Sequence, residues 1–329
     1  MLGAILAILS AASFALNNAM VRRGVVSGTP IQAMAISVPM GVVCFVPMAL
    51  MAGELFRIRQ FPIAAAAWMA GLGVLHFVIG RYCNFRANQA AGVNLTAPVT
   101  QLQVVVTMVL AVIVLHEPCT ALQMIGGALI LAGSLITQRQ SLSARPAAAG
   151  GNTQGAPLFV PRIVAGYFFA SIAALSYGTT PIMARFALEH TGPATGILGG
   201  LIAYVAATAV VALPLLFAQV RRNVFSLSRE NAKWFAYSGV FVAAAQGFFF
   251  CAIALAPVML VMPLLQLSLV FRILFSTWLS PDHEVFGPTV LAGVATSLAG
   301  ALMVAIDTGL IVEFLAVPEP LARMLLWRV

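Results

Sequence analysis

The stretch HEPCTALQMIGGALILAG, from His116 to Gly133, recurs 167 residues later as HEVFGPTVLAGVATSLAG, from His283 to Gly300. Aligned without gaps, both copies begin with His-Glu, carry a glycine near the centre and end with Leu-Ala-Gly. Such a recurrence indicates that the chain contains two copies of one structural unit.

The composition is that of a membrane protein. Of the 329 residues, 61% are hydrophobic and 8% are charged, whereas soluble domains carry about 25% charged residues. Apolar runs of about 20 residues follow one another, each long enough to cross a bilayer as a helix, and they lack the alternation of membrane β-strands. The net charge of +8 comes from basic residues scattered between these runs, which is typical of helix-flanking anchors and not of nucleic-acid binding. The sequence therefore predicts an all-α, polytopic protein of the lipid bilayer.

Ten membrane-spanning helices are predicted, in two sets of five separated by a linker. They cover residues 2–21, 31–52, 63–90, 93–115 and 119–137, then 162–187, 194–217, 233–256, 258–279 and 286–306. The linker is rich in Gly, Pro, Ala and Ser and has no helical periodicity. The predicted domains are a first repeat (1–137), the linker (138–161), a second repeat (162–306) and a tail (307–329). The tail either lies on the membrane surface or is disordered.

The repeat extends beyond its closing phrase. SFALNNAMVRR, from Ser13, lies on SYGTTPIMARF, from Ser176, at an offset of 163. At an offset of 165, Pro98 falls on Pro263 and Gln101 on Gln266. Because each copy has an odd number of spans, the second must enter the membrane upside down, which is the inverted-repeat architecture of many secondary transporters. We therefore predict two inverted five-helix repeats.

The repeated His-Glu pair has two interpretations. A carboxylate at position 117, followed by Pro118, suits the start of the next helix, where it meets the positive end of the helix dipole. We prefer this helix-capping role for Glu117. Gating or substrate contact is the alternative.

Polar residues line the third predicted span. His76, Gly80, Arg81, Asn84 and Asn88 recur at intervals of three and four, which places them on one helical face. Ionisable groups at membrane depth are costly and mark functional sites by default, so Arg81 is predicted to line a cavity, and snorkelling to the membrane interface is the alternative. His76 is either a second cavity residue or a satisfied packing residue.

The repeat adds a partner from the second half. Gln246 falls on Arg81 at an offset of 165. A polar group at the symmetry-related depth favours one shared cavity between the halves, and we formulate the hypothesis that Arg81 and Gln246 both line it.

With these features the chain resembles the EamA-type drug/metabolite transporters. Phe14-Ala15-Leu16-Asn17 stands where that family often has Trp-Gly-x-Asn, Pro98 follows in the fourth span, and Glu117 with the closing glycines matches the family's fifth span. The second copy lacks the Asn. The resemblance implies the inverted-repeat fold, export of amino acids or other small metabolites, and both termini in the cytoplasm.

The charge distribution narrows the expected substrate. All nine acidic residues lie in loops, at helix ends or in the tail, whereas Arg81 and Arg272 lie within spans. Buried cations repel cationic drugs and pair with carboxylates or phosphates, so we predict a small zwitterionic or anionic substrate moved by alternating access. The predicted substrate-binding residues are Arg81, His76, Asn84, Asn17, Gln246, Gln266, Arg272 and Tyr177.

Other functions fit less well. A channel or a non-transporting scaffold is the alternative, and an intramembrane enzyme is disfavoured because GxSxG, HExxH and DxxxD motifs are absent from the sequence. We predict no metal and no cofactor, a bacterial inner (plasma) membrane location, and no nucleic-acid partner. A homodimer is allowed.

Orientation rests on two arguments that disagree. The loops after spans 1, 3, 5 and 7 carry ten Arg or Lys residues, against five on the other side. Positive-inside reasoning therefore favours both termini outside the cytoplasm. We keep the orientation implied by the family resemblance, because three of the ten lie in the long linker.

Overall fold

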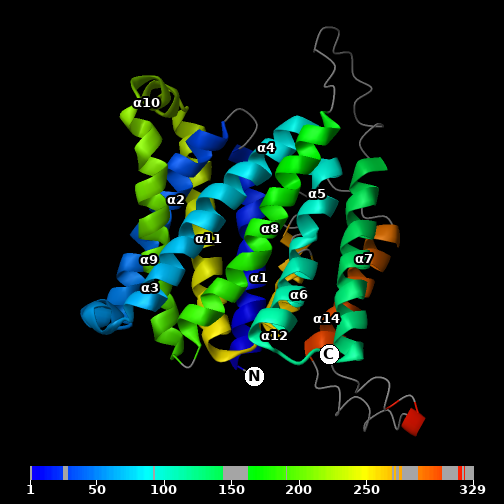
Figure 1. Cartoon of the computed structure of the whole chain (residues 1–329). Helices are drawn as coiled ribbons and strands as arrows, with labels where there is room; N and C mark the ends of the chain where they lie inside the picture. Colours follow the sequence, from blue (N-terminus) through cyan, green and yellow to red (C-terminus); the bar gives the residue numbers. More distant parts are fainter. Residues whose placement is uncertain are drawn as a thin grey trace, which may run out of the picture.

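The computed structural model describes residues 2–24, 29–91, 93–143, 162–189, 191–268, 270, 271, 274, 275, 288–305, 318–320 and 322. This part of the chain consists of helices and the short connections between them (Figure 1). The prediction of an all-α protein is confirmed.

The first half follows the predicted order of spans. Its helices are α1 (Leu2–Gly24), α2 (Pro30–Met51), η1 (Glu54–Gln60), α3 (Ile63–Gly73), η2 (Val74–Gly80), α4 (Arg81–Ala91), α5 (Val93–Gln101), α6 (Gln103–Leu115) and α7 (Ala121–Ser143). The third span is α3, η2 and α4 end to end, and the fourth is α5 with α6. Helix α7 continues past residue 137, where the sequence pattern places the start of the linker.

The second half repeats this order. Its helices are α8 (Ile163–Leu188), α9 (Pro193–Ala212), η3 (Leu213–Leu216), α10 (Ala218–Phe225), α11 (Arg229–Leu255), α12 (Val258–Leu265) and α14 (Pro288–Ala305). Within the described residues, five segments are long and apolar enough to cross a membrane: Pro30–Met51, Ile63–Ala91, Ile163–Leu188, Pro193–Leu216 and Arg229–Leu255. Shorter apolar helices lie in α1, α6, α7 and α14.

The two copies of the repeated phrase pack against each other as α7 and α14. A Cβ atom added at Gly133 would overlap the carbonyl oxygen of Gly293, and one added at Gly300 would overlap the carbonyl oxygen of Gly126. Gly126 and Gly133 are the repeat partners of Gly293 and Gly300, so the contacts are reciprocal, as at a two-fold interface. Small residues allow the close backbone approach that holds membrane helices together.

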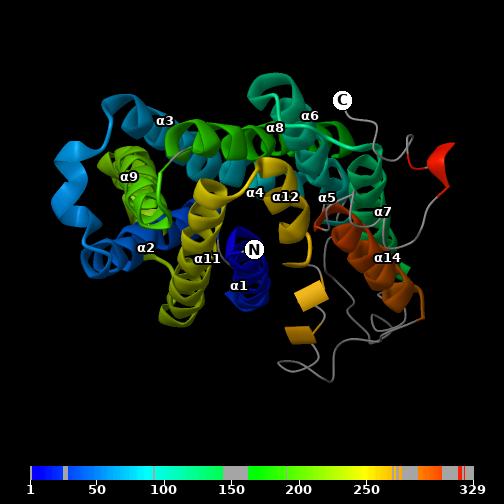
Figure 2. The ribbon, with the colours of Figure 1, turned by 90° about the horizontal axis from the view of Figure 1, so that it is seen from below.

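The same two-fold relation organises the rest of the bundle. Helix α2 packs against its repeat partner α9, and the pairs α3–α9 and α2–α11 are related by the repeat. Figure 2 shows α2 and α9 at one end of the molecule and α7 and α14 at the other, with α1, α11, α8 and α12 between them. The buried core extends from α2, α3 and α9 through α8 and α11 to α12.

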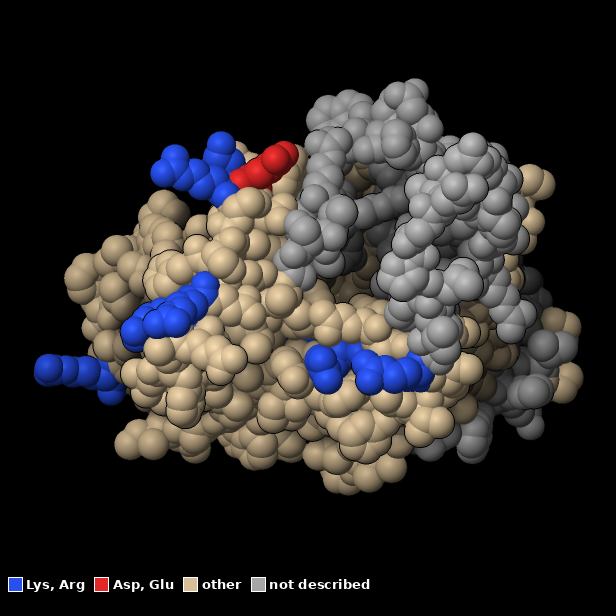
Figure 3. Space-filling view, turned by 90° about the horizontal axis from the view of Figure 1, so that it is seen from above, with Lys and Arg blue, Asp and Glu red and all other residues tan. Residues whose placement is uncertain are grey.

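Helix α1 begins and helix α14 ends on one face of the molecule, which we call the terminal face (Figure 1). The opposite face carries α10, and Lys and Arg side chains are spread over it (Figure 3). The orientation of these faces in the membrane stays a prediction. The predicted tail lies almost entirely outside the described residues.

Candidate functional site

The third span changes its helical pitch near the middle of its length. Between α3 and α4 the chain forms a π-helical segment, η2, and the backbone N–H of Arg81 bonds the carbonyl of His76, five residues earlier. This widened turn brings His76 and Arg81 toward one face of the span, although a regular helix would separate them. Insertions of this kind are rare and frequently occur at functional sites.

His76 joins the two halves of the protein through both of its ring nitrogens. Its Nδ1 lies 3.0 Å from the Thr180 hydroxyl on α8, and its Nε2 lies 3.2 Å from the Gln246 side-chain amide nitrogen on α11. The Thr180 hydroxyl donates its own proton to the carbonyl of Tyr177, so its oxygen accepts from His76 Nδ1–H. Nε2 is then the acceptor for the Gln246 amide, and the imidazole is neutral.

Tyr177 completes this side of the cluster. The Tyr177 ring centroid lies 4.8 Å from that of His76. Gly80 leaves the space for this ring, because a Cβ atom there would come within 2.7 Å of it. Three of the predicted site residues, namely His76, Tyr177 and Gln246, are therefore linked by contacts between helices, and Asn84 lies one turn after Gly80 on α4.

Arg81 lies beside this cluster without an acidic partner. Its Nη1 donates to the buried Ser37 hydroxyl on α2 at 2.9 Å, and its guanidinium lies 5.9 Å from the centroid of the Phe77 ring. Within the described part of the chain, no Asp or Glu forms an ion pair with it. A neutral hydroxyl satisfies one donor and leaves the positive charge uncompensated.

The remaining predicted residues lie elsewhere. Asn17 accepts a 2.5 Å hydrogen bond from Ser238 between α1 and α11. Gln266 accepts a 3.1 Å hydrogen bond from its own repeat partner, Gln101, as expected for a pair on the two-fold axis. Arg272 lies outside the described residues.

Three features of the cluster are missing from the sequence prediction: the π-helical segment, Ser37 and Thr180. Thr180 did leave a signal, because it occupies the position of Asn17 in the second copy. Ser37 lies on a helix with no other polar pattern, and only tertiary structure brings it to Arg81.

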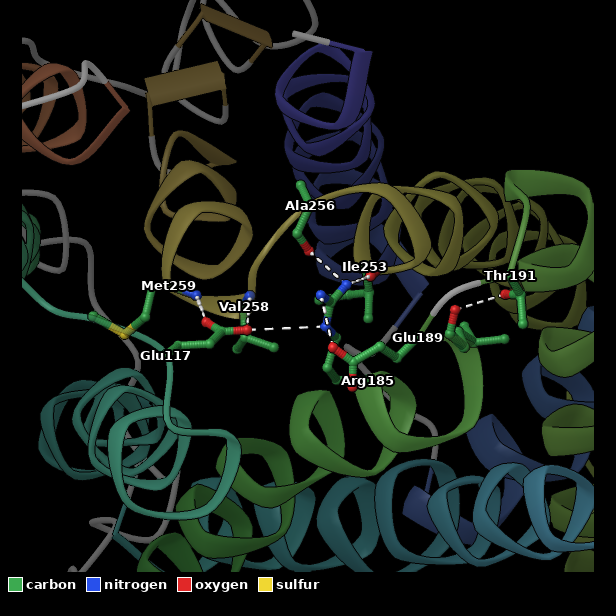
Figure 4. A network of polar contacts seen from close by, with 9 residues as sticks. Glu117, Arg185, Glu189, Thr191, Ile253, Ala256, Val258 and Met259 are labelled. Atoms are coloured by element: carbon green, nitrogen blue, oxygen red, sulfur yellow. Dashed lines mark hydrogen bonds and ion pairs between the residues drawn. The ribbon is translucent and has the colours of Figure 1, made fainter.

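A second polar network closes the terminal face (Figure 4). The Glu117 carboxylate accepts hydrogen bonds from the backbone N–H groups of Val258, at 2.9 Å, and Met259, at 2.8 Å, at the start of α12. Arg185 on α8 approaches Glu117 to 4.0 Å and donates to the carbonyl of Ile253 at 2.9 Å. It also pairs with Glu189 at 3.2 Å. We call this set the Glu117–Arg185 network.

Glu117 therefore caps the start of a helix, as predicted. The prediction of which helix it caps is wrong, because that helix is α12 and not α7. The start of α7 already has a capping box, in which Thr120 and Gln123 bond each other's backbone N–H groups. His116 ends α6 with a left-handed φ of 52°, and this turn leads the chain to place Glu117 against α12 of the other half.

The chain matches the EamA-like transporter family over residues 1–139 and 164–306, which are the two repeats. The chain belongs to the EamA-like transporter family. It is thus a multi-pass membrane transporter of the drug/metabolite transporter superfamily and not an enzyme, and the predicted inverted-repeat fold is confirmed.

A solved structure described only as "Crystal structure of protein" has the same fold as this EamA-like chain. The TM-score is 0.65 with 18% sequence identity, over 95% of this chain and 97% of that one. No curated protein matches the sequence.

Proposed function

We propose that this EamA-like protein exports or exchanges a small zwitterionic or anionic metabolite, such as an amino acid, across a bacterial plasma membrane by alternating access. The observation that carries the proposal is Arg81, a cation within the third span that has a hydroxyl partner and no acidic one among the described residues. A charge at such depth is expensive without a counter-charge, and a substrate carboxylate supplies one.

The neighbouring groups fit a zwitterion. Arg81 follows His76 at the end of the π-helical turn, and the Tyr177 ring packs against His76 with centroids 4.8 Å apart, so all three share one region. Neutral His76 and the Gln246 amide add polar atoms without adding charge. The described spans hold no carboxylate near Arg81 that would attract a permanently cationic drug.

Alternating access is supported by the Glu117–Arg185 network. It ties the loop before α7, in the first half, to α8 and α12, in the second. A channel must open both faces at once, whereas this network holds the halves together at one face.

Counterflow in proteoliposomes tests the substrate class. The wild type is expected to take up a labelled mixture of L-amino acids or a labelled mixture of organic acids, and Arg81→Ala to lose uptake at least about tenfold, the ratio that corresponds to 1.4 kcal/mol. Arg86→Ala is the matched control, because Arg86 lies on the same span with its side chain exposed and its guanidinium 5.8 Å from the Phe169 ring centroid. The control is expected to transport normally.

Two outcomes would contradict the proposal. One is normal uptake by Arg81→Ala. The other is failure of the folded wild type to move either mixture while it moves a quaternary ammonium dye. Size-exclusion profiles in detergent establish that each variant is folded.

A further inference from the structure

Two hydroxyl groups on α9 are buried and lack hydrogen-bond partners among the described residues. They belong to Tyr204, which is 0% exposed, and to Thr208, one helical turn later. Residues four apart lie on the same face of a helix, so both hydroxyls belong to one strip of α9. Buried polar groups are nearly always paired in proteins, and an exception calls for a reason.

Packing does not explain the Tyr204 hydroxyl. The ring stacks on Phe77, with centroids 4.1 Å apart and planes at 20°, and contacts Phe45 at 5.2 Å. Gly41 makes room for it, since a Cβ atom there would overlap the ring. A phenylalanine would make the same contacts without a buried unpaired oxygen. The hydroxyl is therefore an addition that the core does not need.

The position of Tyr204 relates it to Arg81. Phe77, on which it stacks, also lies under the Arg81 guanidinium, whose Cζ is 5.9 Å from the ring centroid. Ser37, the hydrogen-bond partner of Arg81, is one turn before Gly41 on α2. Helix α2 and the span formed by η2 and α4 thus bring Arg81, which has no acidic partner among the described residues, close to the strip of α9 that carries the two hydroxyls.

We propose that Tyr204 and Thr208 are substrate-binding residues, whose hydroxyls donate hydrogen bonds to the carboxylate of the transported metabolite beside Arg81. This inference rests on the proposed function and adds two residues to its site. Hydroxyl donors and a guanidinium together suit a carboxylate, which accepts several charge-assisted hydrogen bonds at once. A substrate carboxylate in this position would accept a hydrogen bond from each hydroxyl.

The test separates a role in substrate binding from a role in packing, because each variant removes one hydroxyl group. Tyr204→Phe and Thr208→Val keep the size of each side chain. We expect the melting temperature without substrate to stay the same or rise, because an unpaired buried hydroxyl is removed. We expect KM for the amino-acid or organic-acid mixture that the wild type transports to rise about tenfold or more in each variant, with a smaller change in kcat. Tyr237→Phe is the control, since Tyr237 is 53% exposed.

The outcomes distinguish this inference from the proposed function. Unchanged KM in both variants, with Arg81→Ala inactive, would overturn the role of the hydroxyls and leave the proposed function standing. The same holds if Tyr204→Phe melts at lower temperature and transports normally, which is the behaviour of a hydroxyl that binds only a structural water. Normal uptake by Arg81→Ala would overturn the proposed function itself.

Discussion

His76 uses both ring nitrogens in contacts with helices of the second half. The donor and acceptor assignments form one chain, from Gln246 through the imidazole and Thr180 to the carbonyl of Tyr177. Protonation of Nε2 would set its N–H against the donating amide of Gln246, and the amide would have to rotate to present its oxygen. The arrangement therefore favours a neutral histidine that connects the halves.

This contact leads to a prediction about energy coupling. Counterflow by the wild type is expected to be the same with and without an imposed pH gradient, because His76 stays neutral. In His76→Gln an amide still donates and accepts, so we expect the variant to fold and to retain more uptake than Arg81→Ala. Gradient-driven accumulation that disappears in His76→Gln would show instead that protons are coupled through this residue.

At the scale of single elements, the spans were predictable and the π segment was not. Burial of about 20 apolar residues in lipid determines where each helix lies, and the ends of α2, α6 and α11 follow the sequence closely. The five-residue hydrogen bond from Arg81 to His76 leaves no composition signal, because it depends on how the span packs against α8 and α9. The spacing of three and four residues therefore grouped the right residues, but it placed them on the face of a regular α-helix, which this span does not form throughout.

The close packing of α7 against α14 leads to a prediction about the melting temperature of two glycine variants. Gly133→Ala and Gly300→Ala each push a methyl group into the backbone of the partner helix, and overpacking of this kind costs about 1–3 kcal/mol. Because the contacts are reciprocal, both variants should lower the melting temperature by similar amounts. Gly192→Ala is the control, since a Cβ atom there meets nothing within 4 Å. A drop in only one of the two glycine variants would contradict the two-fold packing.

At the scale of the whole molecule, the duplication predicted the inverted repeat, and it did not predict individual contacts. Gln101 bonds its own repeat partner Gln266, and the contact of Gly133 with Gly293 has its counterpart in that of Gly300 with Gly126, as an axis that relates equal positions requires. Gln246 was paired in sequence with Arg81, whereas its contact in the structure is His76, on the same span. The reason is that the copies have diverged, so symmetric positions now carry different side chains.

The same symmetry gives the Glu117–Arg185 network a counterpart in the sequence. Glu117 corresponds to Glu284 at an offset of 167, and Arg185 to Arg22 at an offset of 163. Both counterparts carry side chains outside the described residues. The sequence thus carries the same pair of residue types in both copies of the repeat.

Glu117→Gln is expected to open the terminal face. The amide has one acceptor oxygen for two backbone N–H groups and no charge for Arg185, so the tie between the halves weakens.

Cys119, 3% exposed on the same loop, reports the opening in a background where the other three cysteines are alanine. Burial raises the pKa of the Cys119 thiol, which keeps it slow to react with maleimide in the wild type. We expect Glu117→Gln to speed labelling about tenfold or more, because opening exposes the thiol and favours its thiolate. Glu189→Gln is the matched control, since it removes the other carboxylate that pairs with Arg185, four residues along the chain at 3.2 Å, and leaves Glu117 in place. Equal labelling rates in both variants would mean that the network caps α12 without gating the face.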